Sequence, residues 1–449
     1  MLSTYRPAGH RTGLHRTGLH RTGLHRGALG AIGALALGAA AVAGPATADD
    51  AVHDGLVSAN PSNHTPDIED GRVNGIARVG DAMIAGGTFT DVSPAGGGDS
   101  VARDGLVAFA ADTGAIRPAF HPTHSGRITS VLPAGDGATV YVAGSFRTFE
   151  GETRSRVAQI DATDGSLVPG FKPPGIGAVV NDLALSGDTL YIGGAFKTVK
   201  GQPRSALAAL DATTGADTGS VDLAFTNTWN GGKVNVQNLD VSPDGSRLVA
   251  IGNWRRVDGQ SRPQIAVVNT AASPATVAGW ATAGFTKTCA GVFDTYMRDV
   301  DIAPSGDYFV VVTTGAYAGG QKAGTLCDTA SRWELRRRSG GQTPTWVNYT
   351  GGDSLTAVKI TGASVYVGGH QRWMDNGFGE NRAGPGAIPR AGLAALEPAD
   401  GAVTDWDPGR ARGYGVTAFE SLSDGLWIGH DTNRLGGEVR KRIAFMPLP

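Results

Sequence analysis

One pattern recurs seven times along this chain, and it constrains the fold more than any other feature. Each copy opens with an alternating strand and a turn. A second, apolar strand follows and ends in glycine and an aromatic residue, as in Tyr191 to Phe196. A glycine-containing turn then leads to an arginine that has Leu, Val or Ile three positions later. The arginines are Arg103, Arg154, Arg204, Arg262, Arg332, Arg390 and Arg440.

The spacing of these copies predicts the architecture. The first strands are expected to begin near Val73, Ile128, Val179, Val234, Met297, Leu355 and Val416. This spacing of about 50–60 residues, with four short strands in each copy, is typical of a β-propeller blade. The sequence therefore predicts an all-β fold, a seven-bladed β-propeller that forms one domain over residues 49–449. An arginine in every copy indicates a structural role, because its five donors satisfy turn carbonyls or a neighbouring carboxylate.

The last copy is incomplete. After Arg440 the chain has room for only one more strand before Pro449. The stretch from Val52 to Asp70 has no other assignment, so we expect an N-terminal strand from this stretch to close the last blade. Such closure removes free strand edges from the ring.

The N-terminal 48 residues form a predicted signal peptide rather than part of the fold. Residues 1–26 contain five arginines and no acidic residue, and an apolar run from Gly27 to Gly44 precedes Ala46-Thr47-Ala48. This order predicts cleavage after Ala48 and a secreted, extracellular protein; a membrane anchor is the alternative interpretation. After cleavage no segment is long enough to span a membrane.

Charge and cysteine content narrow the partners. Residues 49–449 keep 34 basic residues against 41 acidic ones, a net charge of −7, which argues against nucleic acid. Cys289 and Cys327 are the two cysteines, and in an exported protein such a pair predicts a disulfide bond; a reactive thiol or a metal ligand is the alternative.

The repeat resembles a known family. The pattern Tyr-(Val/Ile)-Gly-Gly-x-Phe, followed by Gly-x-x-Arg-x-x-Leu-Ala-x-(Leu/Ile)-Asp-x-x-Thr-Gly, is similar to the delta-60 repeat of secreted bacterial, especially actinobacterial, β-propellers. The match covers about residues 72–449 and is closest at 179–215. The resemblance implies a seven-bladed propeller outside the membrane. It brings no catalytic residues and no cofactor.

Any specific site is expected where the copies differ. Five copies place an aromatic residue two positions after the glycine, whereas the sixth reads Gly369-His370-Gln371 and the seventh Gly429-His430-Asp431. If these positions are equivalent in adjacent blades, His370, Gln371, His430 and Asp431 form a candidate ligand site. A bound metal ion is one alternative there, and histidines bonded only to turn backbone are the other.

The sixth copy also carries an insertion from Arg372 to Arg390, with Trp373, Met374, Asn376, Phe378, Glu380 and Asn381. Exposed aromatic residues on a long loop suit a carbohydrate or protein ligand, which adds Trp373 to the candidates; side chains that only pack the blade edge are the alternative. The region from Trp280 to Cys327 is expected to form a second ordered loop.

The sequence has no sialidase-type Asp box, no Gly-x-Ser-x-Gly elbow and no His-Glu-x-x-His motif. We therefore expect a monomeric extracellular binding or scaffold module for a glycan or protein ligand, without a catalytic set and without a predicted cofactor. The alternative function is a secreted hydrolase or lyase that acts on polysaccharide at one mouth of the propeller channel.

Overall fold

The computed structural model describes residues 51–315, 324–336 and 340–449. In these residues the regular structure consists of strands and one 3-10 turn, η1 (Gly284–Thr286). The predicted signal peptide lies outside the described residues, so cleavage after Ala48 stays a prediction.

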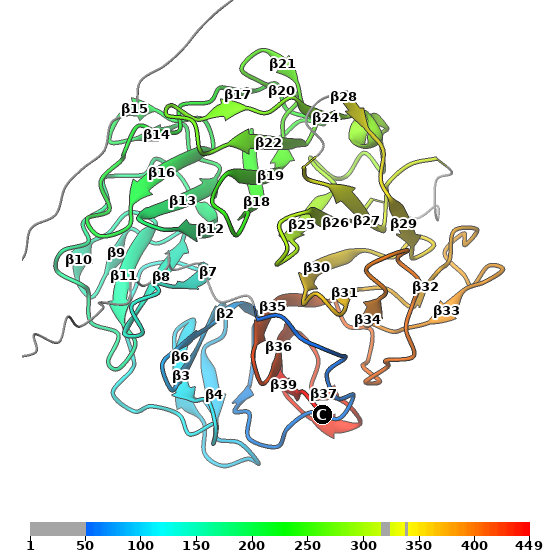
Figure 1. Cartoon of the computed structure of the whole chain (residues 1–449). Helices are drawn as coiled ribbons and strands as arrows, with labels where there is room; N and C mark the ends of the chain where they lie inside the picture. The colour runs from blue at the N-terminus through cyan, green and yellow to red at the C-terminus, as the bar shows by residue number, and fades with distance from the viewer. Residues whose placement is uncertain (1–50, 316–323, 337–339) are drawn as a thin grey trace, which may run out of the picture. The chain divides into compact units, whose positions relative to one another are not determined.

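Seven antiparallel sheets, numbered 1 to 7 in chain order, stand around a common centre (Figure 1). Their innermost strands are β2 (Val73–Val79), β7 (Ile128–Pro133), β12 (Val180–Ser186), β18 (Asn235–Val241), β25 (Met297–Ile302), β30 (Leu355–Ile360) and β35 (Val416–Leu422). Each start agrees with the predicted one to within one residue. The all-β propeller fold expected from the sequence is confirmed.

The outer strands repeat the same order. The second strands are β3 (Ala82–Gly87), β8 (Thr139–Gly144), β13 (Thr189–Gly194), β19 (Arg247–Asn253), β26 (Tyr308–Thr313), β31 (Val365–Gly369) and β36 (Gly425–His430). The third strands are β6 (Leu106–Ala110), β11 (Val157–Asp161), β16 (Leu207–Asp211), β22 (Ile265–Asn269), β27 (Thr329–Glu334), β34 (Leu393–Leu396) and β39 (Ile443–Pro447).

A fourth strand is regular in only two sheets, as β23 (Thr276–Val277) and β29 (Trp346–Tyr349). In sheets 1, 2, 3 and 6 it is reduced to one bridge, at Ile116, Leu167, Asp217 and Val403. The sequence therefore overestimated the length of the outermost strands, because turn residues occupy most of those positions.

Further short strands lie in the loops, most of them as hairpins between the second and third strands of one sheet. They are β1 (Asp67–Ile68), β4 (Asp91–Ser93), β5 (Val101–Ala102), β9 (Thr148–Phe149), β10 (Glu152–Thr153), β14 (Thr198–Val199), β15 (Gln202–Pro203), β17 (Phe225–Thr226), β20 (Arg256–Val257), β21 (Gln260–Ser261), β24 (Trp280–Thr282), β28 (Gly340–Gln342), β32 (Trp373–Met374), β33 (Ile388–Pro389), β37 (Arg434–Leu435) and β38 (Glu438–Val439).

Every innermost strand contains a β-bulge near its start, after the first residue in six strands and after the second, Val236, in β18. In five sheets the bulged residue donates a side-chain hydrogen bond to the carbonyl of the residue just before the bulge in the next innermost strand. The donors are Asn74, Thr129, Asn181, Thr356 and Thr417, and their acceptors are Ile128, Val180, Val236, Val416 and Val73. The bond from Thr417 to Val73 joins sheet 7 to sheet 1. A bulge re-aims a side chain out of the pleat, which explains how these side chains reach the neighbouring sheet.

The apolar core is divided among the junctions between sheets. Seven clusters of buried residues each combine side chains of two neighbouring sheets. One of them packs Val73 and Phe109 of sheet 1 against Trp427 and Phe445 of sheet 7, so the ring is closed by burial as well.

The N-terminal stretch lies beside the last sheet, as expected, and Figure 1 shows its blue trace next to the red strands. Ser58 N donates to Pro447 O at 2.7 Å and Ser62 N to Phe445 O at 2.8 Å. The segment along β39 is irregular rather than a strand; the short strand β1 (Asp67–Ile68) pairs with β4 instead. The stretch therefore covers the outer edge of sheet 7 through isolated hydrogen bonds.

Candidate functional site

The candidate residues lie at one end of the sheets. We call it the loop end: the end at which each innermost strand begins and each second strand finishes. His370 follows β31 there, and its Nδ1–H donates to the carbonyl of Gly413, while its backbone N–H donates to Ser354 O at 2.7 Å. His370 thus bonds to turn backbone, the alternative that the sequence left open.

His370 and His430 do not occupy equivalent positions, so that prediction is wrong. His430 pairs with Val416, the first residue of β35, whereas in sheet 6 Gly369 pairs with Leu355. The counterpart of His370 is therefore Asp431. The pattern misled because sheet 6 has two glycines in succession, Gly368 and Gly369, whereas sheet 7 has only the first, Gly429, with His430 in place of the second.

The place of His430 holds glycine in five sheets, at Gly87, Gly144, Gly194, Gly252 and Gly369. A Cβ atom at any of these five would come within 2.0 to 2.3 Å of a backbone carbonyl oxygen. A side chain at this position needs a different local backbone. In sheet 7 the preceding loop provides one, because Gly415 has a φ of 147° that favours glycine.

His430 is fully buried, with Nδ1 at 3.1 Å from Thr432 Oγ1. Its Nε2 has no hydrogen-bond partner in the described parts of the chain. Burial, aided by the charges of Arg410 and Arg442, lowers the pKa of His430 well below its usual value, so the imidazole is neutral at physiological pH.

Asp431 organises the loop that precedes β35. Its carboxylate accepts from Arg410 at 2.5 Å, from Gly415 N at 3.2 Å and from Tyr414 N. The Arg410 side chain has no exposed surface, and burial lowers its pKa to about 10, a shift that the charge of Asp431 opposes. Both oxygens of Asp431 are thus engaged in holding Arg410 and the 407–415 loop.

Gln371 takes the place at which other sheets bury an aromatic ring. It is fully buried, and neither its Oε1 nor its Nε2 has a partner in the described residues. Gln371 and His430 are therefore interior residues. The other two candidates, His370 and Asp431, both bind the loop 407–415: His370 bonds to Gly413 and Asp431 bonds to Tyr414.

Next to these residues lies a hydrogen-bonded network that the sequence pattern did not indicate. The buried carboxylate of Asp353 accepts from Arg372 Nε at 2.8 Å and from Arg412 Nη2 at 2.5 Å. The guanidinium of Arg372 also lies over the ring of Trp373, 4.3 Å from its centroid. Trp373 is half-buried, and this stacking fixes it beside the two arginines.

The insertion of sheet 6 is an ordered loop built on β32 and β33. Asn376 is fully buried and binds three backbone groups of the surrounding chain: Thr350 O, Arg382 O and Gly384 N. Phe378, two residues after Asn376, is 82% exposed. Met374 and Asn376 are both fully buried, which agrees with the alternative of side chains that pack the blade edge.

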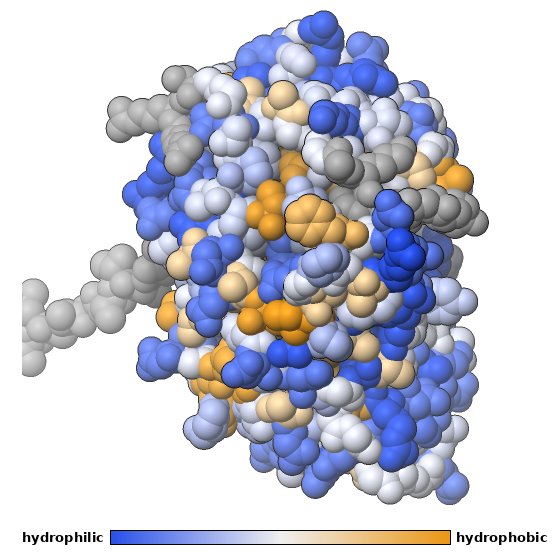
Figure 2. Space-filling model, turned by 90° about the vertical axis from the view of Figure 1, so that its right-hand side faces the viewer, coloured by the Kyte–Doolittle hydropathy of each residue, from blue (hydrophilic) through white to orange (hydrophobic). Residues whose placement is uncertain are grey.

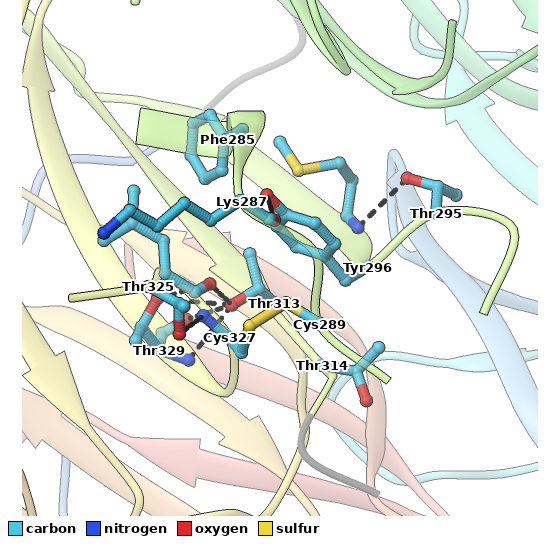
Figure 3. Close-up of a disulfide and its surroundings, with 12 residues drawn as sticks. Phe285, Lys287, Cys289, Thr295, Tyr296, Thr313, Thr314, Thr325, Cys327 and Thr329 are labelled. Carbon is cyan, nitrogen blue, oxygen red and sulfur yellow. Dashed lines mark hydrogen bonds between the residues drawn. A yellow bond between two sulfur atoms is a disulfide. The ribbon is translucent and has the colours of Figure 1, made fainter. Parts of the chain in front are cut away.

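Cys289 and Cys327 form the expected disulfide, with their Cα atoms 5.8 Å apart. The bond lies among Tyr296, whose hydroxyl donates to Lys287 O at 3.1 Å, and the bonded pair Thr313 and Thr329 (Figure 3). It ties the loop before β25 to the start of β27. Part of the region from Trp280 to Cys327, residues 316–323, lies outside the described chain.

Six of the seven repeat arginines make the same contact, donating from Nη1 to the carbonyl of the preceding residue. Four also bond a carbonyl of the outermost segment, at Arg117, Ala278, Thr404 and Ser62. Each of these four arginines therefore joins the outermost segment to its sheet through a hydrogen bond. In sheet 7 that segment is the N-terminal stretch.

Arg332 is not equivalent to the other six, which corrects the sequence alignment. Ala330 pairs with Val312, as Leu106 pairs with Gly86 in sheet 1, so the arginine position in sheet 5 is held by Cys327. Arg332 lies within β27 instead, with its guanidinium 3.8 Å from the ring centroid of Tyr308. The disulfide of sheet 5 stands where the other sheets have the arginine.

The centre of the ring holds a cavity of about 410 Å³, lined by residues of all seven innermost strands. None of the five predicted ligand residues lines it. Its ionisable residues are Asp182, Asp240, Asp299, Asp301, Lys359 and Glu420. Many of its polar side chains bind the next sheet: Asp182 accepts from Leu239 N at 3.2 Å and Asp299 from Val358 N at 2.8 Å.

Two of these channel carboxyls are protonated more readily than usual. Burial raises the pKa of Asp182 to about 6. Burial also raises the pKa of Asp299, to about 8, and the charges of Asp182 and Asp301 add to that shift. The signal for these residues was present in the sequence as polar residues inside predicted innermost strands, but only the ring places them around one cavity.

The residues that the structure describes include no group of three or more His, Cys, Asp or Glu side chains arranged to hold a metal ion. In the same residues, no helix has the length and apolar character needed to cross a membrane.

Comparisons with known proteins agree with the fold. The family profile described as "Domain of unknown function (DUF5122) beta-propeller" matches residues 139–171. The WD40 repeats of RRP9 superpose with a TM-score of 0.51 and 12% identity over 87% of this chain and 99% of that one. The WD40 propeller domain of Doa1 has a TM-score of 0.49 and 10% identity over 87% and 95% of the two chains. No curated protein matches the sequence significantly. The family profile and the RRP9 superposition thus agree with a β-propeller fold, which by itself assigns no function.

Proposed function

We propose that this protein is an exported, monomeric, seven-bladed binding module without a catalytic set, which holds a glycan or protein ligand at the loop end of sheets 6 and 7. The observation that carries the proposal is the pair of exposed rings, Phe378 and Tyr414, 82% and 87% exposed. Each belongs to a loop held by buried polar contacts. Rigid loops that present exposed aromatic side chains lose little entropy when they bind.

Export rests on the sequence pattern of the first 48 residues. We expect the full-length chain, expressed in an exporting bacterium, to appear in the medium with Asp49 as its first residue. Mass spectrometry of the secreted protein measures this. Retention in the membrane with an intact N-terminus would contradict it.

A glycan array probed with the secreted protein tests the binding function. We expect specific binding that Phe378→Ala and Tyr414→Ala each reduce at least tenfold, without a change in thermal unfolding. Val292→Ala is a matched control, because Val292 is also exposed (63%) but belongs to the loop before sheet 5. Binding unaffected by both ring variants would reject this surface.

A second candidate function, a hydrolase or lyase in the channel, is favoured by one observation. Asp182 and Asp299 are carboxyls of raised pKa beside the central cavity, and such groups serve as general acids or bases. Release of reducing ends or unsaturated sugars from a polysaccharide, lost in Asp299→Asn, would support this candidate. Binding without product release would exclude it for the substrates tested.

A further inference from the structure

Two arginines at the loop end, Arg372 and Arg412, share one carboxylate, that of Asp353. Asp353 has a side chain that is 2% exposed and receives hydrogen bonds from both guanidiniums, of Arg372 and Arg412. One carboxylate thus serves two cations. The remaining positive charge stands at a surface where the arginine side chains are 30% and 36% exposed.

Both arginines keep donors for a ligand. Arg372 uses Nε and Nη2 on Asp353 and Asn381, and Arg412 uses Nε on His370 O and Nη2 on Asp353. The Nη1 group of each makes no hydrogen bond within the described segments of the chain. Because the buried carboxylate and the backbone hold the other nitrogens, these two groups are already oriented.

The charge around this pair is opposite to that of the protein. The four loops at the loop end of sheets 6 and 7 (350–354, 370–392, 407–415 and 430–442) contain nine basic and six acidic residues. Residues 49–449 as a whole have an excess of seven acidic residues. The local excess of positive charge therefore favours an anionic ligand at this end of the two sheets.

The loops that carry the two arginines also carry aromatic residues. Trp373 lies against Arg372, and Tyr414 follows two residues after Arg412. Phe378 belongs to the loop that Asn381 joins to Arg372. The loops that carry the two exposed rings are tied down, at Asn376 in one and through Asp431 in the other.

From this geometry we infer that the loop end of sheets 6 and 7 binds a carboxylated polysaccharide, an inference that rests on the proposed binding function. The apolar face of each sugar ring packs on an exposed aromatic ring, and its carboxylate accepts from the Nη1 groups of Arg372 and Arg412 as a charge-assisted pair. A polysaccharide repeats the apolar face and the carboxylate at every sugar. One chain therefore contacts Phe378 and Tyr414 at the same time.

An acidic protein fits this surface less well. A stable protein interface buries about 800 Å² on each partner around an apolar centre. Here the two loops that carry the exposed rings, 370–392 and 407–415, contain five basic and three acidic residues. Figure 2 shows the side formed by sheets 5 and 6, where apolar residues occur in short groups within a hydrophilic surface.

Isothermal titration of the secreted protein tests the inference with three probes: polygalacturonate, its fully methyl-esterified form and poly-L-glutamate. We expect binding to polygalacturonate, a loss of at least tenfold for the uncharged ester, and no binding to poly-L-glutamate. Arg412→Ala should weaken polygalacturonate binding at least tenfold and Arg412→Lys less, since lysine keeps the charge but not the forked donors.

The controls separate folding from binding. Arg336→Ala removes an exposed arginine, paired with Asp307 at 2.8 Å beside the hairpin turn opposite the loop end, and should leave affinity unchanged. If Arg412→Ala fails to fold, the comparison of polygalacturonate with its methyl ester on the wild-type protein still tests the charge pairing. Equal binding of the ester, or binding of poly-L-glutamate, would overturn the inference while leaving the proposed function intact. An array with no binding at all would overturn both.

Discussion

Sheets 2 and 3 repeat each other closely, whereas sheets 6 and 7 keep the same strand pairing but differ in the loop after the second strand. In sheets 2 and 3 the second strand leads into a buried ring, Phe146 or Phe196, and a short hairpin. At the same place sheet 6 has buried Gln371 and a loop of about 20 residues, and sheet 7 has Thr432. The ring tolerates these changes because bulge contacts and interface clusters, which both kinds of sheet share, hold it closed.

The difference separates two tasks. Apolar residues at the repeated positions build the ring, and their loss exposes or empties a junction between sheets. Polar residues in sheets 6 and 7 instead fix loops at the surface, as Asp353, Asn376 and Asp431 do. Stability and binding should therefore respond to different variants.

The largest effect is expected from the channel, where sheet 5 has Asp299 and sheets 6 and 7 have Ala357 and Ala418 at the equivalent place. Folding raises the pKa of Asp299 from 3.8 to about 8, so its contribution is complete below about pH 4 and is lost as the pH rises through 8. Urea unfolding between pH 4 and 9 should show this decline in the wild type and a flatter curve in Asp299→Asn. Parallel curves would mean that the carboxyl ionises freely in the folded protein.

The next largest loss of stability is expected when the buried aromatic ring of a regular sheet is removed. Phe196→Ala takes away a side chain that is 1% exposed and should reduce the free energy of unfolding by about 3–5 kcal/mol. Thr432→Ala, at the matching place in sheet 7, should cost less than about 1 kcal/mol. Chemical denaturation of both variants measures the contrast, and similar losses would show that the two sheets depend equally on this position.

Removal of the disulfide of sheet 5 should reduce the free energy of unfolding by a similar amount. Cys289 and Cys327 are 38 positions apart, and a loop of that size stabilises by roughly 4 kcal/mol when it is closed. The double variant Cys289→Ala/Cys327→Ala should lose most of that, whereas Arg154→Ala, which removes the matching arginine of sheet 2, should lose about 1 kcal/mol. A double variant with an unchanged melting temperature would show that this loop is held by other contacts.

Gln371→Leu should stabilise the protein by about 1–3 kcal/mol, because the wild-type amide is buried without a partner in the described residues. Leucine has a similar volume and no polar group to desolvate. Differential scanning calorimetry measures the shift. A loss of stability would indicate that an ordered water or a ligand satisfies the amide.

The smallest effects on stability are expected at the exposed rings. Phe378→Ala and Tyr414→Ala should each change the free energy of unfolding by less than about 0.5 kcal/mol, since little of either ring is buried. Their effect should appear in ligand binding alone. A destabilisation above about 1 kcal/mol in denaturant would assign these residues to the fold rather than to a ligand surface.

The periodic part of the molecule was predictable in detail. The starts of the innermost strands, the pairing of Cys289 with Cys327 and the use of the N-terminal stretch at the edge of sheet 7 follow from patterns that are local or repeated. Register was less predictable at the irregular copies. Aligning the histidines by the preceding glycine gave a false equivalence between His370 and His430, and the spacing of Arg332 matched the repeat by coincidence.

The candidate site was predicted only in outline. The sequence indicated the loops of sheets 6 and 7 but favoured His430 and Gln371, which are interior, and missed Asp353 and Arg412, which stand in different loops. No spacing rule connects residues 59 positions apart in irregular segments. Their contact depends on how two neighbouring sheets bring their loops to the same end.

By itself the sequence determined the repeat, the class of fold and the positions that build the ring, because each of these depends on local alternation and turn chemistry repeated in every copy. Only the tertiary structure decided which polar residues meet. It placed Asp182 and Asp299 around one cavity and Asp353 beneath two arginines, since closing the ring brings together side chains that no local pattern relates.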